Sequence, residues 1–285
     1  MRSSALIASA LWLALPASAL AAPPAPVTAA PAFAPQRFSV VVKGSGPDVI
    51  LVPGLTASRE IWAGTVAAVP GYRYHLVQVA GFAGEPARGN ASGSVVAPVA
   101  EEIARYIRAR GLKRPAIIGH SMGGTIALMV AARHPDVIGK AMVVDMLPQP
   151  AGFVGSSAAG VRGLADALKG LTATPNGRRL VESAIQMFGG AEPGDRRSDT
   201  DVVARATHEL AVTDLTPELP RIKAPLTIVY AAPDPQTAAS VAHRYAAGYR
   251  AKADAKLVRI DGSGHMIMHD QRTRVPAALK EFLSR

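Results

Sequence analysis

Short apolar runs alternate with longer amphipathic segments along most of this chain. Runs rich in β-branched and apolar residues predict seven strands, at residues 38–42, 49–52, 74–79, 116–118, 141–144, 226–230 and 256–260. Several of these runs are continuously apolar, which is typical of strands that are covered on both faces of a sheet.

Helical patterns lie between the predicted strands. In residues 94–110, the apolar side chains of Val99, Ile103, Tyr106 and Ile107 share one face, and the pattern ends at Gly111. Further helices are expected at residues 125–133, which end just before Pro135, and at residues 275–283. This alternation predicts an α/β fold with a mostly parallel, doubly wound sheet and helices on both of its sides.

One region interrupts the alternation. Residues 146–215 contain no convincing strand, and helical patterns appear at 180–188 and 202–210. About 70 residues is long for an ordinary connection, which favours a helical cap insertion over a plain set of crossover helices. The core is then expected to comprise residues 37–145 and 216–285.

The first residues resemble a targeting segment rather than part of the core. Residues 1–21 combine Arg2, an apolar run and small residues near Ala19, which predicts a cleaved secretory signal and a periplasmic or secreted protein. An uncleaved membrane anchor is the alternative, but the apolar run is shorter than the roughly 20 residues that a spanning helix needs. Residues 22–36 are rich in Pro and Ala and predict an extended linker.

Composition excludes several classes of site. Hydrophobic residues make up 49% and charged residues 18% of the 285 residues, so a large core is expected. The formal net charge is +10, but Lys and Arg are scattered and do not form the aromatic-interleaved stripe of a nucleic-acid binder. The absence of cysteine excludes disulfides and thiolate catalysis. No metal-binding motif is present in the sequence, and no cofactor is expected.

The chemistry centres on a serine between glycines. Ser121 lies two residues from Gly119 and from Gly123, with a predicted strand before it and a predicted helix after it. A connection of only residues 119–123 must reverse direction sharply, which lifts the central hydroxyl clear of the sheet at a helix N-terminus. We therefore expect Ser121 to be a nucleophile rather than an incidental serine in a glycine-rich turn.

A serine nucleophile needs a base. The chain has seven histidines, and His265 is the one in a loop after the last predicted strand, where sheets of this kind build active sites. His269 is the competitor, although a surface role is expected for it. The other five histidines lie next to Ser121, within a predicted strand or in helical patterns.

The orienting carboxylate has two candidates, and each follows a predicted strand. Asp234 preserves the chain order of nucleophile, acid and histidine, and it follows the strand just before the one that leads to His265. Asp145 is the second candidate. The sequence favours Asp234 and assigns the other aspartate to a turn or cap.

An anion site is expected beside Ser121. Residues 52–55, Val-Pro-Gly-Leu, follow an apolar strand, and the backbone N–H groups of Leu55 and Met122 are the expected oxyanion donors. An ordinary Pro-Gly turn is the alternative.

Together, the motifs VPGL, GHSMGG, APD and GSGHMI resemble those of the α/β-hydrolase family. The resemblance covers residues 38 to 285 except the insertion, which in that family is usually a variable cap. After the third strand, many members carry an Asp in a loop that shapes the pocket. Here that loop reads VAGFAGEPA, with Ala80 in place of the acid.

The expected reaction is acyl transfer to water from a small-molecule substrate, with carboxylic esters favoured. In the family, an aspartate at this turn serves dehalogenases and epoxide hydrolases, whereas a serine implies acyl chemistry. Hydrolysis of carbon–carbon bonds, an aminopeptidase activity and a slow-turnover ligand-binding protein on a hydrolase scaffold remain open. Nothing in the sequence indicates nucleic acid, a stable membrane span after signal removal, or a particular oligomeric state.

Overall fold

The fold is taken from a computed structural model, which describes residues 33–154, 174 and 197–285. The expected signal and most of the linker, residues 22–32, therefore lie outside the described residues. So do most of the expected cap insertion and its helical pattern at residues 180–188.

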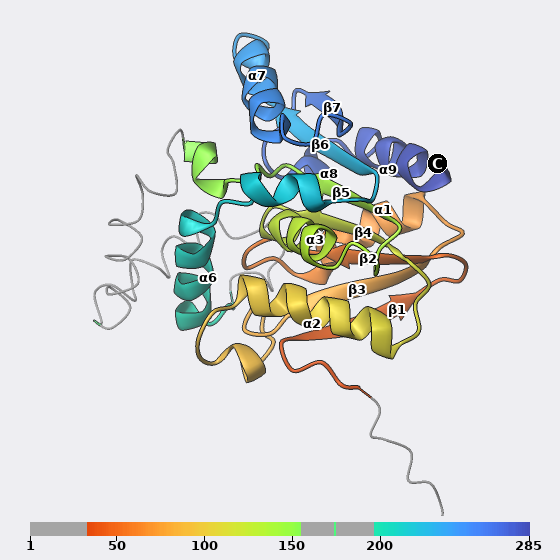
Figure 1. The fold of residues 1–285 in the computed structure, drawn as a ribbon, viewed down its shortest axis with the longest axis vertical. Coiled ribbons are helices and arrows are strands. Elements are labelled where there is room, and N and C mark those ends of the chain that lie inside the picture. The colour runs from red at the N-terminus through yellow and green to blue at the C-terminus, as the bar shows by residue number, and fades with distance from the viewer. Residues whose placement is uncertain (1–32, 155–173, 175–196) are drawn as a thin grey trace, which may run out of the picture. The chain divides into compact units, whose positions relative to one another are not determined.

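Within the described ranges, seven strands form one sheet in the order β1-β3-β2-β4-β5-β6-β7 (Figure 1). The strands are β1 (Phe38–Lys43), β2 (Asp48–Val52), β3 (Arg73–Val79), β4 (Ala116–His120), β5 (Lys140–Val144), β6 (Leu226–Ala232) and β7 (Lys256–Asp261). β1 runs antiparallel to β3 and every other neighbouring pair is parallel. This confirms the predicted α/β class and all seven predicted strands.

Helices cover both faces of the sheet because alternate strand residues point to opposite sides. In β4, Ile117 belongs to an apolar cluster with α2 (Val96–Ala109) and α3 (Met122–Arg133). Its neighbour Ile118 belongs to a second cluster with α9 (Arg274–Ser284). The other elements within the described residues are α1 (Ala63–Ala68), α6 (Thr200–Val212), α7 (Ala238–Tyr249) and α8 (Ile267–Asp270), and the short 3₁₀ helices η1 (Arg59–Trp62), η2 (Arg88–Asn90), η3 (Pro150–Val154) and η4 (Thr216–Arg221).

The amino end of α2 is held by a carboxylate from α6. The side chain of Glu209 accepts hydrogen bonds from the backbone N–H groups of Val95, Val96 and Ala97 at 2.7, 2.9 and 2.8 Å. A negative charge at this end of a helix is favourable because the first N–H groups have no intrahelical partner. Glu209 thus fixes α6, the described end of the expected insertion, against the core.

The loop after β3 is bonded to the segment that enters α6. The N–H of Asp199 donates to the carbonyl of Gly81 at 2.7 Å, and the N–H of Gly84 donates to the carbonyl of Arg197 at 3.1 Å. Ser198 Oγ accepts from the N–H of Ala83 at 3.1 Å. The loop that begins at Ala80 is therefore shaped by the segment that enters α6.

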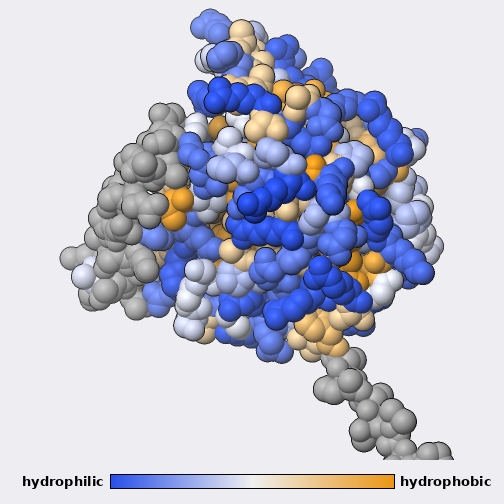
Figure 2. Space-filling view, in the orientation of Figure 1, coloured by the Kyte–Doolittle hydropathy of each residue, from blue (hydrophilic) through white to orange (hydrophobic). Residues whose placement is uncertain are grey.

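Hydrophilic residues cover most of the face that Figure 2 shows, with hydrophobic residues emerging singly or in small groups. Among the helices of residues 33–154 and 197–285, none is both long enough and apolar enough to cross a membrane.

Candidate active site

A single residue joins β4 to α3. β4 runs to His120 and α3 begins at Met122, so Ser121 alone makes the turn. The backbone of Ser121 has φ 54° and ψ −123°, a conformation that non-glycine residues rarely adopt and that costs of order 1–3 kcal/mol. The turn is tighter than the connection of residues 119–123 that the sequence predicted. Gly119 and His120 belong to β4, and Met122 and Gly123 already belong to α3.

The two flanking glycines are required by close backbone approach. A β-carbon at Gly119 would lie 1.9 Å from the carbonyl oxygen of Gly123, and one at Gly123 would lie 2.2 Å from the carbonyl oxygen of Val52. Both contacts are far inside van der Waals distance and both are with backbone, which has little freedom to move. The glycine spacing around Ser121 therefore belongs to the turn itself.

Parallel register brings three chain segments to the same edge of the sheet. Val52 pairs with Gly119, so the Pro53–Gly54–Leu55 turn begins beside the strand that carries Ser121. His120 pairs with Val144, which places the next residue, Asp145, beside Ser121. The N–H of Ser121 donates to the carbonyl of Val144 at 2.9 Å and fixes this register up to the turn.

His265 follows β7 and is hydrogen-bonded to Asp145. Its Nδ1 lies 2.7 Å from Oδ2 of Asp145, whose side chain is only 4% exposed. A carboxylate can only accept, so Nδ1 carries the proton and the neutral imidazole has its lone pair on Nε2. The imidazole itself is 44% exposed, so a substrate can reach it.

The structure does not place Asp234 in this contact. Oδ1 of Asp234 accepts from the N–H of Gln236 at 2.9 Å, and its carbonyl accepts from the N–H of Thr237 at 3.1 Å. Asp234 therefore closes the turn that leads into α7. The preference for Asp234 over Asp145 is corrected: the carboxylate against His265 is that of Asp145, and Asp234 has the turn role expected of the unused aspartate.

The carboxylate of Asp145 is held on its other oxygen as well. Oδ1 accepts from the N–H of Ala231 at 2.9 Å and from the hydroxyl of Tyr245 at 2.8 Å. Tyr245, on α7, stacks on Tyr230 with ring centroids 4.3 Å apart. Burial and the adjacent Asp145 charge raise the pKa of Tyr245, so its hydroxyl keeps the proton that it donates. Asp145 thus has fixed donors on both oxygens.

Tyr245 was not anticipated from the sequence. It lies in a helical pattern 100 residues from Asp145, and nothing local marks it as a partner. A signal did exist for Asp145 itself. The residues around it, Val143, Val144, Met146 and Leu147, are all apolar, as expected of a buried carboxylate, whereas Asp234 lies between two prolines.

Backbone N–H groups are available beside Ser121. The N–H groups of Gly124 and Thr125 donate to the carbonyl of Ser121, which leaves those of Met122 and Gly123 in the first turn of α3, where no intrahelical acceptor exists. Leu55 follows Gly54, and a β-carbon at Gly54 would lie 3.2 Å from Cβ of Ser121. Both segments expected to supply oxyanion donors therefore adjoin the serine.

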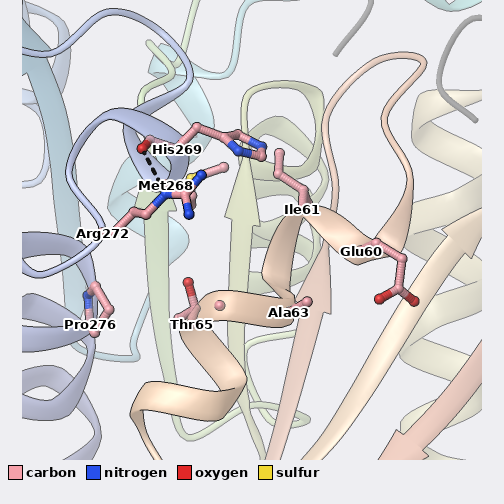
Figure 3. Close-up of a pocket in the computed structure, with 9 residues that line it drawn as sticks. Glu60, Ile61, Ala63, Thr65, Met268, His269, Arg272 and Pro276 are labelled. Carbon is pink, nitrogen blue, oxygen red and sulfur yellow. Dashed lines mark hydrogen bonds between the residues drawn. The ribbon is translucent and has the colours of Figure 1, made fainter. Parts of the chain in front are cut away.

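His269, the alternative base, borders a different hollow. A cavity of about 350 Å³ is lined by Glu60, Ile61, Ala63, Gly64, Thr65, Met268, His269, Arg272 and Pro276. In Figure 3 the imidazole of His269 lies near Ile61, and Arg272 donates to the carbonyl of His269 at 3.4 Å. None of Ser121, Asp145 and His265 is among the lining residues.

Across the described residues, no cluster of three or more His, Asp or Glu side chains is arranged to hold a metal ion.

The family model for the alpha/beta hydrolase family matches residues 49–278. The chain belongs to this family. The match includes the serine turn, Asp145 and the His265 loop, and it agrees with the strand order and helix layers of the α/β hydrolase fold.

Similar proteins include esterases. The chain is 34% identical over 109 residues to a pimeloyl-[acyl-carrier protein] methyl ester esterase of Vibrio atlanticus, a match covering 38% of this chain and 40% of that protein. The chain thus matches less than half the length of this curated relative. A thermophilic esterase from Thermogutta terrifontis superposes with a TM-score of 0.67 at 20% identity, over 87% of this chain and 93% of that one. An enol-lactonase from Burkholderia xenovorans LB400 gives 0.62 at 19% identity, over 87% and 96%.

Proposed function

We propose that this α/β hydrolase cleaves carboxylic esters through an acyl-enzyme, with Ser121 as nucleophile, His265 as general base and Asp145 as the orienting carboxylate. The observation that carries the proposal is the arrangement at one sheet edge. A serine occupies the strained turn, and the following strands supply an imidazole bonded to a buried carboxylate.

The proposed reaction follows from the hydrogen bonds. With Nδ1 donating to Asp145, Nε2 of His265 accepts the Ser121 proton as Oγ attacks the carbonyl carbon. The N–H groups of Met122 and Leu55 stabilise the negative oxygen that forms; losing one such donor typically costs about 3 kcal/mol of transition-state stabilisation. The imidazolium protonates the leaving alkoxide, and water attacks the acyl-enzyme by the same route.

Two observations favour carboxylic esters as the substrates. Serine at the turn favours acyl chemistry, because displacement at an alkyl carbon uses a carboxylate nucleophile there. The Vibrio relative is a methyl ester esterase, and its similarity favours the same bond type in this chain. Peptide cleavage and slow-turnover binding then become outcomes of the test.

A substrate panel tests this function. Purified protein is incubated with p-nitrophenyl esters of increasing acyl length, an aminoacyl anilide and a lactone, beside the Ser121→Ala variant. The proposal expects ester turnover in the wild type and its loss in the variant, with the circular dichroism spectrum unchanged. Faster anilide than ester turnover would instead support a peptidase, and no turnover of any substrate would support a binding protein.

We also propose that residues 1–21 direct export and that the mature protein is periplasmic or secreted, with residues 22–36 as a linker. The support is the charge, apolar run and small residues of the sequence alone. N-terminal sequencing of protein recovered outside the cytoplasm tests it, and an intact Met1 terminus in that protein would contradict it.

A further inference from the structure

The residue before the serine contacts the loop that carries the base. His120 ends β4 and is 2% exposed. Its Nε2 lies 2.9 Å from the carbonyl oxygen of His265, and the two imidazole rings have centroids 4.8 Å apart. A carbonyl oxygen only accepts, so Nε2 of His120 carries a proton and donates it.

The other side of the His120 ring faces the proposed oxyanion loop. A β-carbon built on Gly54 would lie 3.1 Å from Nδ1 of His120. Nδ1 is buried, and it has no hydrogen-bond partner among the residues that the structure describes. The imidazole of His120 therefore lies between Gly54 and the His265 loop, and His120 directly precedes Ser121 in the chain.

We propose that His120 is a positioning residue, whose Nε2–H holds the backbone of His265 at the distance from the serine turn that proton transfer requires. This inference rests on the proposed function, because it concerns the geometry of the same reaction. His120 contacts no reacting atom in this account. It acts through the His265 main chain, while Asp145 acts on the His265 side chain.

The role requires a neutral imidazole. Three titratable groups influence His120: His265, Asp145 and His269. Burial, and secondarily the nearby His265, lower the pKa of His120 to about 3, so the ring stays neutral while His265 gains and loses its proton. A permanently neutral donor can hold the carbonyl without placing a second positive charge beside the imidazolium.

Two isosteric variants separate positioning from packing. The amide nitrogen of Gln occupies the place of Nε2 and can donate to the carbonyl of His265, whereas that of Asn occupies the place of Nδ1 and cannot reach it. We expect His120→Asn to lower kcat by about 100-fold, as a misplaced catalytic group does, with KM nearly unchanged. His120→Gln should keep most of the activity.

Rescue by Gln is the readout that packing alone would not give. Both side chains replace the imidazole with a smaller group, and only Gln restores the donor to the carbonyl of His265. Equal losses of kcat in both folded variants would overturn the proposal.

His75→Gln is the matched control. His75 is a second buried histidine, bonded to Tyr106 at 2.7 Å and to Asp48 at 2.9 Å, toward the amino ends of β2 and β3. Its replacement should lower the melting temperature and leave kcat unchanged. NMR of the wild-type protein tests the proposal even if the Asn variant does not fold. Histidine ¹⁵N NMR should find His120 as the neutral Nε2–H tautomer throughout the active pH range, and an Nδ1–H tautomer would overturn the proposal. The Ser121→Ala variant tests whether Ser121 is the nucleophile and does not depend on any measurement on His120. The proposed function and the role of His120 can therefore fail separately.

Discussion

Nδ1 of His265 lies 2.7 Å from Oδ2 of Asp145, although 120 residues separate them in the chain. Parallel strands β4 to β7 bring them together, because the carboxyl ends of all four strands lie at one edge of the sheet. The contact fixes the tautomer of His265, and it makes Asp145 the aspartate on which the proposed reaction depends.

Removing this carboxylate should abolish most of the activity. Asp145→Asn keeps the shape of the side chain but favours the wrong imidazole tautomer, and we expect kcat to fall by roughly 10⁴-fold. Asp234→Asn removes a negative charge but keeps an oxygen that can accept from the N–H of Gln236 in an exposed turn, and it should remain close to wild type in kcat. Steady-state kinetics on the same ester compare the two variants, and a crippled Asp234 variant with an active Asp145 variant would reverse the assignment.

Replacing Tyr245 should lower kcat more than replacing Tyr249, which lies one turn further along α7. Tyr245→Phe removes the hydroxyl that donates to the buried Asp145 carboxylate and should cost about 2 kcal/mol of stability. If about 1.4 kcal/mol of that loss also appears in the transition state, kcat falls about tenfold. The matched control is Tyr249→Phe, since the Tyr249 hydroxyl donates to the backbone carbonyl of Met146 at 2.7 Å. It should lower the free energy of unfolding but not kcat, and equal kinetic effects would argue against a role for Tyr245.

The strand pattern of this chain was readable from its sequence because buried parallel strands are continuously apolar. The seven predicted strands all form, and the face of α2 that carries Val99, Ile103 and Ile107 is buried as expected. The boundaries were less accurate. β6 continues to Ala232, beyond the predicted end at residue 230, and β4 continues to His120, because the sheet's hydrogen bonds extend past the apolar residues that mark each strand.

The choice between two aspartates could not be made in the same way. Both follow strands that end at the same edge of the sheet, and the apolar residues around Asp145 indicate burial but not which histidine it contacts. What distinguishes them is a set of long-range contacts, from Ala231, Tyr245 and His265, to a side chain that is buried. Asp234 lies two residues beyond its strand, where its carboxylate accepts a hydrogen bond from the N–H of Gln236 in its own turn.

The turn glycines give a stability prediction. Gly123→Ala would place a β-carbon 2.2 Å from the carbonyl oxygen of Val52, and overpacking against backbone should cost about 3 kcal/mol or more. Gly64→Ala, in α1, meets nothing within 4 Å and should stabilise the protein by about 0.5–1 kcal/mol. Chemical denaturation compares the two, and a tolerated Gly123→Ala would contradict the turn geometry.

His120 should make stability depend on pH. Its pKa is about 3 in the folded protein and about 6.5 when unfolded, so the unfolded chain binds the proton more readily as pH falls. The folded state therefore loses stability progressively from about pH 6.5 down to about pH 3, by roughly 2 kcal/mol at pH 5. His120→Gln should lose about 2 kcal/mol less than wild type between about pH 7.5 and about pH 5. Parallel losses in both proteins, measured by denaturation at each pH, would contradict a buried neutral His120.

Covalent labelling tests the central claim most directly. A fluorophosphonate reacts with a serine hydroxyl only when a neighbouring base activates it and an oxyanion site accepts the phosphoryl oxygen. Incubation followed by peptide mass spectrometry should find one adduct per chain, on Ser121, and none in the Ser121→Ala variant. An unlabelled wild-type protein, or an adduct on another residue that persists in the variant, would contradict the account of this site as a serine hydrolase centre.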